Sequence, residues 1–210
     1  MEVRGFEDTI RWYDENAEAY ADAVYKVIPV ELIEQFLASL PAKPKVLDAG
    51  CGPGEDARVF YDRGAGVVGV DMSKGLLSVA RKKNPDIRFI EADIRRLPLE
   101  ASAFDGVWAH ASLVHFEKID DVLQALSEFH RVLKPGGVLH VFVKAQTGKE
   151  QTSIISDSLS NHERFYRYFE PMEMKDYVER SGFTVTSTAF PEDLHGRSEV
   201  RWLQVLAKRN

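Results

Sequence analysis

Three carboxylates stand inside or just after short apolar runs, where a charged side chain is unusual. Asp48 lies inside the first run, Asp71 directly follows the second, and Asp93 comes soon after the third. A buried carboxylate is costly unless a cation or a hydrogen bond satisfies it. An acid such as Asp71 can accept both hydroxyls of a ribose, a cation would satisfy Asp48, and Asp93 can accept an adenine amino group. One such acid alone is more often a helix cap, but three in corresponding positions predict a nucleoside-binding edge.

The segment DAGCGPGE, residues 48–55, carries the chain from the first run into a helical segment through glycines. Glycines permit a tight turn and bring bare backbone against a ligand. Glu55 occupies the position that a dinucleotide fingerprint gives to its third glycine, and a carboxylate at a helix N-terminus opposes a pyrophosphate. The turn therefore favours a cationic ligand without phosphate over NAD. The alternative for Asp48 is that it accepts backbone or water hydrogen bonds inside the turn.

Among the six histidines, His115 is the best candidate for a general base. It lies in a loop just after the fourth apolar run, and an imidazole titrates near neutral pH. The alternative is a loop or helix-cap histidine. His110 would shape the pocket, and His140, within the fifth run, is expected to be structural. His162 and His195 lie in variable segments, from which their side chains could reach a substrate.

The elements that position these residues alternate along the chain. Five short runs rich in Val and Ile suit strands that are buried on both faces of a parallel sheet: residues 46–49, 67–70, 88–90, 104–108 and 138–143. Before and between these runs lie segments of helical period, with apolar stripes at Ile33–Leu40 and Val122–Leu133 and a further helix over Glu55–Arg63. Strands that alternate with helices indicate βαβ units with right-handed crossovers.

The C-terminal part departs from this alternation. A helix is predicted over Pro171–Ser181, followed by strands near residues 183–188 and 200–207. The connection between these last strands is too short for a helix, so they are expected to pair antiparallel. The predicted fold is an α/β, Rossmann-like, doubly wound sheet of seven strands, mostly parallel with a C-terminal antiparallel hairpin and with helices on both faces.

Composition limits the class of partner. The 210 residues are 44% hydrophobic and 29% charged, with a net charge of −6, which is typical of a globular chain and disfavours nucleic acid as a partner. The single cysteine, Cys51, excludes an intrachain disulfide and favours a reducing compartment, and we expect it to be a packed residue of the turn. The first 20 residues lack the apolar core of a signal peptide, and no apolar stretch reaches the roughly 18 residues of a membrane span. A cytoplasmic protein without membrane contact or metal site is therefore expected.

Five ordered segments of the chain resemble the motifs of class I S-adenosylmethionine-dependent methyltransferases. They are VLDAGCGPGEDA, VVGVDMS, FIEADIRRLP, FDGVWAHASLVHF and LSEFHRVLKPGGVLHVFV, within residues 42–144. The similarity is greatest to the small-molecule branch that includes quinone-biosynthesis-type enzymes (methyltransferase type 11/25-like). It implies S-adenosylmethionine as methyl donor, with S-adenosylhomocysteine as product, and a small-molecule acceptor.

The resemblance also implies a set of donor-binding positions. The turn backbone would contact the methionine portion, Asp71 the ribose, and the pair Asp93 and Ile94 the adenine. Tyr13 and Tyr20 lie in a segment similar to the family's lid helix, and simple helix packing is the alternative for them. The complete set is Tyr13, Tyr20, Asp48, Gly50, Cys51, Gly52, Asp71, Met72, Ser73, Asp93, Ile94, Ala109 and His110.

The expected organisation is a single methyltransferase domain over residues 1–210. It would consist of an N-terminal helical lid (1–40), a donor-binding core (42–144), an acceptor-side insertion (145–170) and a C-terminal helix and hairpin (171–210). The expected reaction is in-line displacement of the methyl group onto an O, N or C atom of a small molecule. Orientation of the acceptor is expected to supply much of the rate enhancement. His115 is the candidate base if the acceptor must lose a proton. The alternatives are a non-catalytic protein that binds S-adenosylmethionine and, disfavoured by the acidic composition, an RNA methyltransferase.

Overall fold

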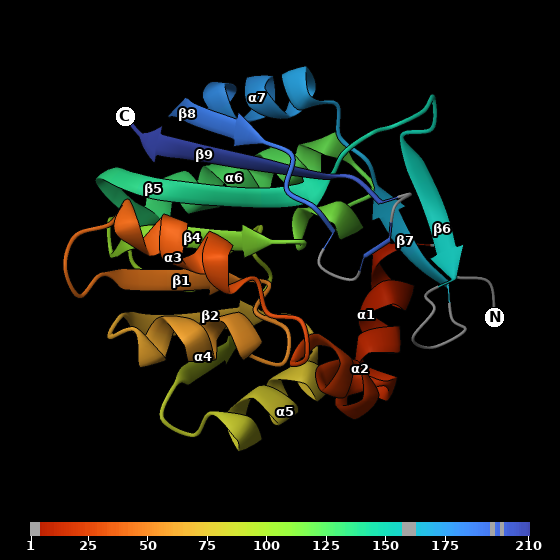
Figure 1. The fold of residues 1–210 in the computed structure, drawn as a ribbon, viewed down its shortest axis with the longest axis horizontal. Helices are drawn as coiled ribbons and strands as arrows, with labels where there is room; N and C mark the ends of the chain where they lie inside the picture. The colour runs from red at the N-terminus through yellow and green to blue at the C-terminus, as the bar shows by residue number, and fades with distance from the viewer. Residues whose placement is uncertain (1–4, 157–162, 194–195, 198–199) are drawn as a thin grey trace.

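A seven-stranded sheet runs through the centre of the molecule (Figure 1). The computed structural model describes residues 5–156, 163–193, 196–197 and 200–210. The strand order is β3-β2-β1-β4-β5-β9-β8, in which β1 to β5 are parallel and β9 is antiparallel to both β5 and β8. The predicted fold class, including the C-terminal hairpin, is thus confirmed. The strands are β1 (Lys45–Ala49), β2 (Gly66–Asp71), β3 (Arg88–Glu91), β4 (Phe104–His110), β5 (Leu133–Lys144), β8 (Phe183–Ala189) and β9 (Trp202–Arg209).

Helices cover both faces of the sheet. On one face lie α3 (Val30–Ala38), α4 (Glu55–Asp62) and α5 (Lys74–Lys83), which pack through two apolar clusters against β1, β3 and β4. On the other face lie α6 (Ile119–Val132) and α7 (Pro171–Arg180). Right-handed crossovers between parallel strands produce this two-faced arrangement. The predicted helical segments all occur, with ends that differ from the prediction by a few residues.

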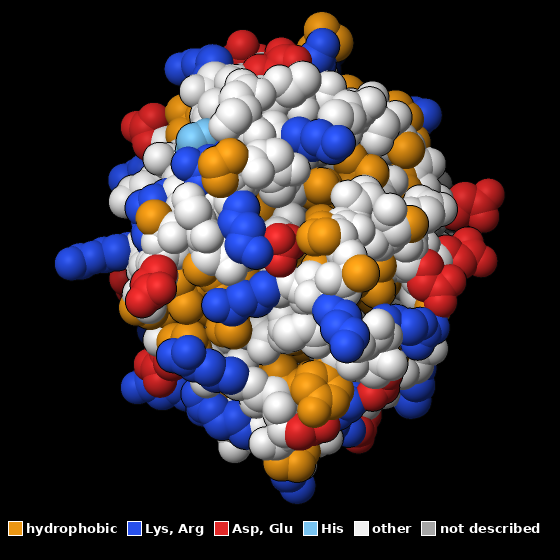
Figure 2. Space-filling view, turned by 90° about the vertical axis from the view of Figure 1, so that its left-hand side faces the viewer, with side chains coloured by type: hydrophobic (Ala, Val, Ile, Leu, Met, Phe, Trp, Pro, Cys, Tyr) orange, Lys and Arg blue, Asp and Glu red, His pale blue; other side chains and the backbone are white. Residues whose placement is uncertain are grey.

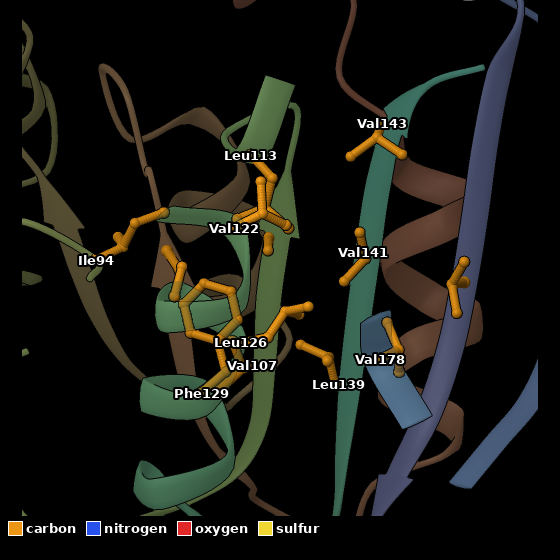
Figure 3. Close-up of a cluster of buried hydrophobic side chains, with 14 of the residues drawn as sticks. Ile94, Val107, Leu113, Val122, Leu126, Phe129, Leu139, Val141, Val143 and Val178 are labelled. Atoms are coloured by element: carbon orange, nitrogen blue, oxygen red, sulfur yellow. The ribbon is translucent and has the colours of Figure 1, made fainter. Parts of the chain in front are cut away.

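The largest apolar cluster lies between α6 and the sheet (Figure 3). Val122, Leu126 and Phe129 recur at helical spacing on one face of α6 and are fully buried. They pack toward Val107 of β4 and Val141 of β5, which are also fully buried. Each such side chain contributes about 1.5–3 kcal/mol through removal from water. This packing fixes the central strands, and with them the loops at their carboxyl ends.

Additional elements gather at the carboxyl edge of the parallel strands, on the right in Figure 1. Two N-terminal helices, α1 (Phe6–Glu15) and α2 (Ala17–Val24), pack against α5 there. The expected insertion over residues 145–170 contains an antiparallel ribbon, β6 (Thr152–Ser156) and β7 (Glu163–Arg167), which the sequence had not indicated. A 3-10 turn, η1 (Leu113–His115), follows β4 and contacts β7.

Neither the helices nor the visible surface consists of long apolar stretches in the described residues. None of the helices in the described ranges is long and apolar enough to cross a membrane. Figure 2 shows the face opposite the carboxyl edge, where basic and acidic side chains are interspersed with hydrophobic ones.

Candidate functional site

The glycine-rich turn after β1 is held in place by β2 and by the loop after β4. The backbone N–H groups of Gly50 and Cys51 donate to the carbonyl of Val70 at 2.8 and 3.0 Å. Gly50 has φ +81°, and a Cβ there would lie 2.4 Å from the Cβ of Ser112. A side chain at this position is therefore excluded both by backbone conformation and by space. The turn presents bare backbone to the carboxyl edge of the sheet.

Asp71, at the end of β2, is fixed by the same turn. One carboxylate oxygen accepts the N–H of Gly52 at 2.9 Å, and the other accepts the N–H of Ser73 at 2.9 Å. Each oxygen keeps a second lone pair for a ligand hydroxyl. Burial raises the pKa of Asp71, and the two backbone bonds oppose that rise. The carboxyl group is thus pre-oriented by backbone and not by a side chain that could rotate.

Three further acids surround the turn and lack cationic partners in the described contacts. Asp48 is 2% exposed and its Oδ2 has no hydrogen-bond partner in the described structure. Asp56 accepts the indole N–H of Trp108 at 2.7 Å. Burial raises the pKa values of Asp48 and Glu55 well above their usual range, and that of Asp56 to about 6. The mutual repulsion of these carboxyl groups acts in the same direction for Asp48 and Glu55.

This charge distribution fits S-adenosylmethionine. The donor carries an ammonium and a sulfonium group and no phosphate. The unpartnered oxygen of Asp48 and the neighbouring Glu55 favour a cation, which would offset the desolvation that raises their pKa values. A pyrophosphate would instead add negative charge beside acids that are already repelling one another.

The acids face a cavity of about 230 Å³ between the carboxyl edge and the N-terminal helices. Most of the predicted site residues line it. They are Tyr13, Tyr20, Asp48, Gly50, Cys51, Gly52, Asp71, Met72, Ile94, His110 and His115. Burial raises the pKa of the Cys51 thiol well above its usual range, so the thiol stays protonated.

Three predicted residues are near the cavity without lining it. The hydroxyl of Ser73 caps α5 by accepting the N–H of Leu76 at 3.1 Å and donates to Asp14 at 2.6 Å. Asp93 binds the guanidinium of Arg95, with contacts of 2.6 to 3.0 Å, while its neighbours Ala92 and Ile94 reach the cavity wall. Ala109 is fully buried in β4.

His115 is buried and bonded through both ring nitrogens. Nδ1 lies 3.0 Å from the carbonyl of Phe165, which can only accept, so Nδ1 carries the proton. Nε2 lies 3.2 Å from the hydroxyl of Tyr13 and therefore accepts from it. The same hydroxyl accepts Nη1 of Arg164 at 2.7 Å. Burial, with the charges of Arg164 and Lys144 acting in the same direction, lowers the pKa of His115 to about 3.

Two other histidines stack on the sheet face. The ring of His140 lies 3.7 Å from that of Trp108 and is fully buried, as expected for a structural residue. His110 stacks on Phe142 at 4.3 Å and lines the cavity, and burial lowers its pKa to about 3. His162 and His195 lie outside the described residues.

Cationic and aromatic residues form the opposite wall, and part of this group lies in the acceptor-side insertion predicted over residues 145–170; sequence reasoning missed Lys144 and Trp202. Lys144 ends β5, and its position after an apolar run was the same signal that identified Asp71. Tyr166 comes from β7, whose pairing the sequence did not reveal, and Trp202 begins β9, whose hairpin was predicted but not its contact with the cavity. These residues line the cavity together with Phe142, Arg164, Asp193 and Arg197.

A Rossmann-like sheet with a glycine-rich turn and buried acids at its carboxyl edge is the arrangement that the resemblance to class I methyltransferases predicts. Residues 47–141 match the family model described as a methyltransferase domain. This match covers just under half of the chain, and it agrees with the resemblance to the small-molecule branch of class I S-adenosylmethionine-dependent methyltransferases.

Curated relatives share this central part. The chain is 38% identical over 108 residues to the malonyl-[acyl-carrier protein] O-methyltransferase of Enterobacter lignolyticus, covering 50% of this chain and 42% of that protein. It is 40% identical over 100 residues to the demethylmenaquinone methyltransferase of Chlorobaculum tepidum, covering 47% of this chain and 40% of that protein. The matches thus span less than half the length of either relative.

A solved structure extends the likeness of the fold to the whole chain. The 1,6-didemethyltoxoflavin-N1-methyltransferase of Burkholderia thailandensis, solved with 1,6-didemethyltoxoflavin and S-adenosylhomocysteine bound, superposes with a TM-score of 0.75 at 20% identity. The superposition covers 100% of this chain and 92% of the Burkholderia chain. This likeness concerns the fold.

Proposed function

We propose that the chain transfers a methyl group from S-adenosylmethionine to an O, N or C atom of a small molecule. The observation that carries the proposal is the uncompensated buried carboxyl group of Asp48 beside Glu55, in a cavity that Asp71 also lines. A cationic nucleoside satisfies all three acids, whereas a dinucleotide satisfies only Asp71.

Each residue around the donor then has a defined role. The backbone of Gly50 and Gly52 and the carboxylate of Asp48 would hold the methionine portion, and Asp71 the ribose hydroxyls. Ala92 and Ile94 would face the adenine, with the Asp93 carboxylate held beside them by Arg95.

The N-terminal helices would close the site. Tyr13 and Tyr20 line the cavity from α1 and α2, and their rings pack edge to face, 5.0 Å apart. Asp14 of α1 accepts the N–H of Gly75 at 2.9 Å, which docks the pair of helices at the start of α5. We propose that this cover excludes water and fixes the acceptor in line with the donor.

When bound, the donor supplies a methyl group that its sulfonium has already activated, so the protein itself does not have to activate this group. Orientation of the acceptor is the main task. The general-base role predicted for His115 applies only to an acceptor that must lose a proton. Since Nε2 of His115 already accepts from Tyr13, we propose that His115 holds Tyr13 over the donor and stays neutral.

The proposal is tested by calorimetric titration with S-adenosylmethionine, S-adenosylhomocysteine and NAD in parallel. We expect micromolar binding of the first two and no heat with NAD. Binding of NAD alone would refute the proposal and indicate a dehydrogenase-like site. Donor binding without product from a broad panel of small acceptors and bulk RNA would instead indicate a non-catalytic binding protein.

A further inference from the structure

The cavity has two walls of opposite charge. The acidic wall is formed by the ends of β1 and β2 and the start of α4, with Asp48, Asp71 and Glu55. The opposite wall comes from the end of β5, from β7 and from the segment between β8 and β9, with Lys144, Arg164 and Arg197 among the lining residues. Because β4 lies between β1 and β5 in the sheet, the two walls lie on either side of the end of β4.

The partners of the basic wall differ from residue to residue. The guanidinium of Arg197 binds both oxygens of Asp193 at 2.7 and 3.0 Å. The indole N–H of Trp202 donates to Asp193 as well, at 2.8 Å. Arg164 donates to Tyr13. Arg197 and Arg164 are therefore engaged with neighbouring residues of the protein.

Lys144 is different. It is 5% exposed, and within the described part of the chain its Nζ has neither a hydrogen-bond nor an ion-pair partner. Its ammonium lies 3.6 Å from the ring centroid of Tyr166 and 6.0 Å from that of Trp202. Ring faces offset only part of the cost of burying a cation. The ammonium thus stands at the cavity wall with its hydrogen-bonding capacity available.

We propose that Lys144 binds a carboxylate of the methyl acceptor, so that the acceptor belongs to the class of small carboxylic acids with an apolar or planar body. This proposal rests on the proposed function, because it assigns the acceptor to the wall opposite the donor. A single ammonium flanked by Tyr166, Trp202 and Phe142 matches a monoanion attached to an apolar group. A phosphate dianion would call for several convergent donors.

The position of the lysine agrees with this assignment. The ends of parallel strands and the loops beyond them form the ligand-binding edge of such a sheet. Burial and the charges of Arg197 and Arg164 lower the pKa of Lys144 to about 8, with Asp193 opposing them. The ammonium form therefore predominates at neutral pH, and a bound carboxylate stabilises it further.

The test compares carboxylates with uncharged analogues of the same shape. Benzoate, cinnamate and hexanoate, each beside its primary amide, are titrated into the full chain saturated with S-adenosylhomocysteine, by calorimetry. We expect at least one carboxylate to bind about ten-fold or more tightly than its amide. In Lys144→Met this preference disappears, and in Lys144→Arg it persists. Lys175→Met, on α7 and away from the cavity, serves as the matched control and retains the preference.

A pH series gives a second readout that a merely structural lysine would not produce. The charged or titratable groups facing Lys144 are Arg164, Arg197, Asp193, Tyr166 and the ring of His115. Of these, none is expected to change charge between pH 7 and 9: burial raises the pKa of Tyr166 to about 12 and lowers that of His115 to about 3. Carboxylate affinity should fall above about pH 8 in the native chain, as the Lys144 ammonium loses its proton, and stay constant in Lys144→Arg.

The outcomes separate this inference from the proposed function. Equal affinity for carboxylates and amides, no binding of any of the three acids, or a preference that survives Lys144→Met would overturn the carboxylate assignment. Binding of S-adenosylhomocysteine to the native chain, recorded in the same experiments, would still support the methyltransferase. Failure of S-adenosylhomocysteine to bind the native chain would refute the proposed function itself.

Discussion

The hydroxyl of Tyr13 lies 3.2 Å from Nε2 of His115, although 102 positions separate the two residues in the sequence. Arg164 donates to the same hydroxyl at 2.7 Å from a third segment. One phenol thus joins the N-terminal helix α1, the turn after β4 and the ribbon strand β7. The N–H of Phe165, which donates to Thr9, also joins β7 to α1, and the carbonyl of Phe165 binds His115.

Tyr13→Phe removes this junction. His115 and Arg164 each lose a buried partner, and an unsatisfied buried polar group costs about 1–3 kcal/mol. For a chain of this size we expect Tm to fall by roughly 2–4 °C per kcal/mol, measured by calorimetry. Tyr61→Phe, at an exposed position, is the control and should leave Tm unchanged. Equal Tm values for the two variants would mean that the junction contributes nothing to stability.

The His115 ring should remain neutral, with the proton on Nδ1, from pH 5 to 8. Burial lowers its pKa to about 3, and the bond from Nδ1 to the Phe165 carbonyl fixes the tautomer. Nitrogen-15 NMR of the imidazole, assigned by comparison with His115→Asn, measures both properties. A titration of this ring with a midpoint near 6.5 would contradict the positioning role and restore the prediction of a general base.

Asp71→Ala should weaken binding of S-adenosylhomocysteine by about ten-fold or more, the scale of a lost charge-assisted hydrogen bond. The measurement is calorimetry on a variant shown to be folded by circular dichroism. Asp86→Ala is the control, because that carboxylate pairs with Arg58 on the surface. Unchanged affinity in folded Asp71→Ala would exclude Asp71 as the ribose acid.

Asp56→Asn should stabilise the ligand-free protein at neutral pH. Burial raises the pKa of Asp56 to about 6 in the folded chain, against 3.8 for a free aspartate. Its folded-state stabilisation is complete below about pH 4 and is lost as the pH rises through 6, because the buried group must then ionise. Asparagine stays neutral and can still accept from Trp108. We expect the variant to gain on the order of 1–3 kcal/mol between pH 4 and 7.

The measurement is urea unfolding of both proteins at pH 4, 5, 6 and 7. The difference in unfolding free energy should be small at the lowest pH and increase toward neutrality. A difference that does not change with pH would show that Asp56 ionises in the folded chain as freely as in the unfolded one.

Gly50→Ala should be more harmful than the same change at Gly64. Both glycines have φ near +80°, at +81° and +86°, where an L side chain costs about 1–2 kcal/mol. A Cβ at Gly64 meets no atom within 4 Å, whereas at Gly50 it lies 2.4 Å from the Cβ of Ser112. Chemical unfolding should show the larger loss for Gly50→Ala, and only this variant should also lose donor binding. Equal losses would mean that Ser112 moves aside without cost.

The sequence was sufficient for the sheet and for the donor side of the site, because both depend on local patterns. Apolar runs and glycine turns identified β1 to β5, and the acids at the run ends marked the binding edge. Asp93 illustrates the limit of such reasoning. An acid at a strand end predicts a ligand contact, but the contact from Arg95, two positions away, is decided by side-chain geometry.

The sequence indicated that residues 145–170 lie on the acceptor side, but the members of the opposite wall could not be predicted, because its assembly depends on long-range packing. Tyr166 and Arg164 reach the cavity only because β7 pairs with β6 and packs beside α1. Trp202 lines the cavity because β9 lies beside β5. Neither pairing leaves a periodic signal in residues 145–170 or 189–202. Lys144, directly after the fifth apolar run, is a member of this wall that a local signal could have identified.

The bond between Arg164 and Tyr13 connects the cover over the donor with the ribbon on the acceptor side. A ligand that orders one of these segments thereby lowers the entropic cost of ordering the other. Donor and acceptor would then bind with positive cooperativity, and the factor by which each raises the affinity of the other would be the same. The hydroxyl of Tyr13 would be one route for this coupling, beside the contact of the Phe165 N–H with Thr9.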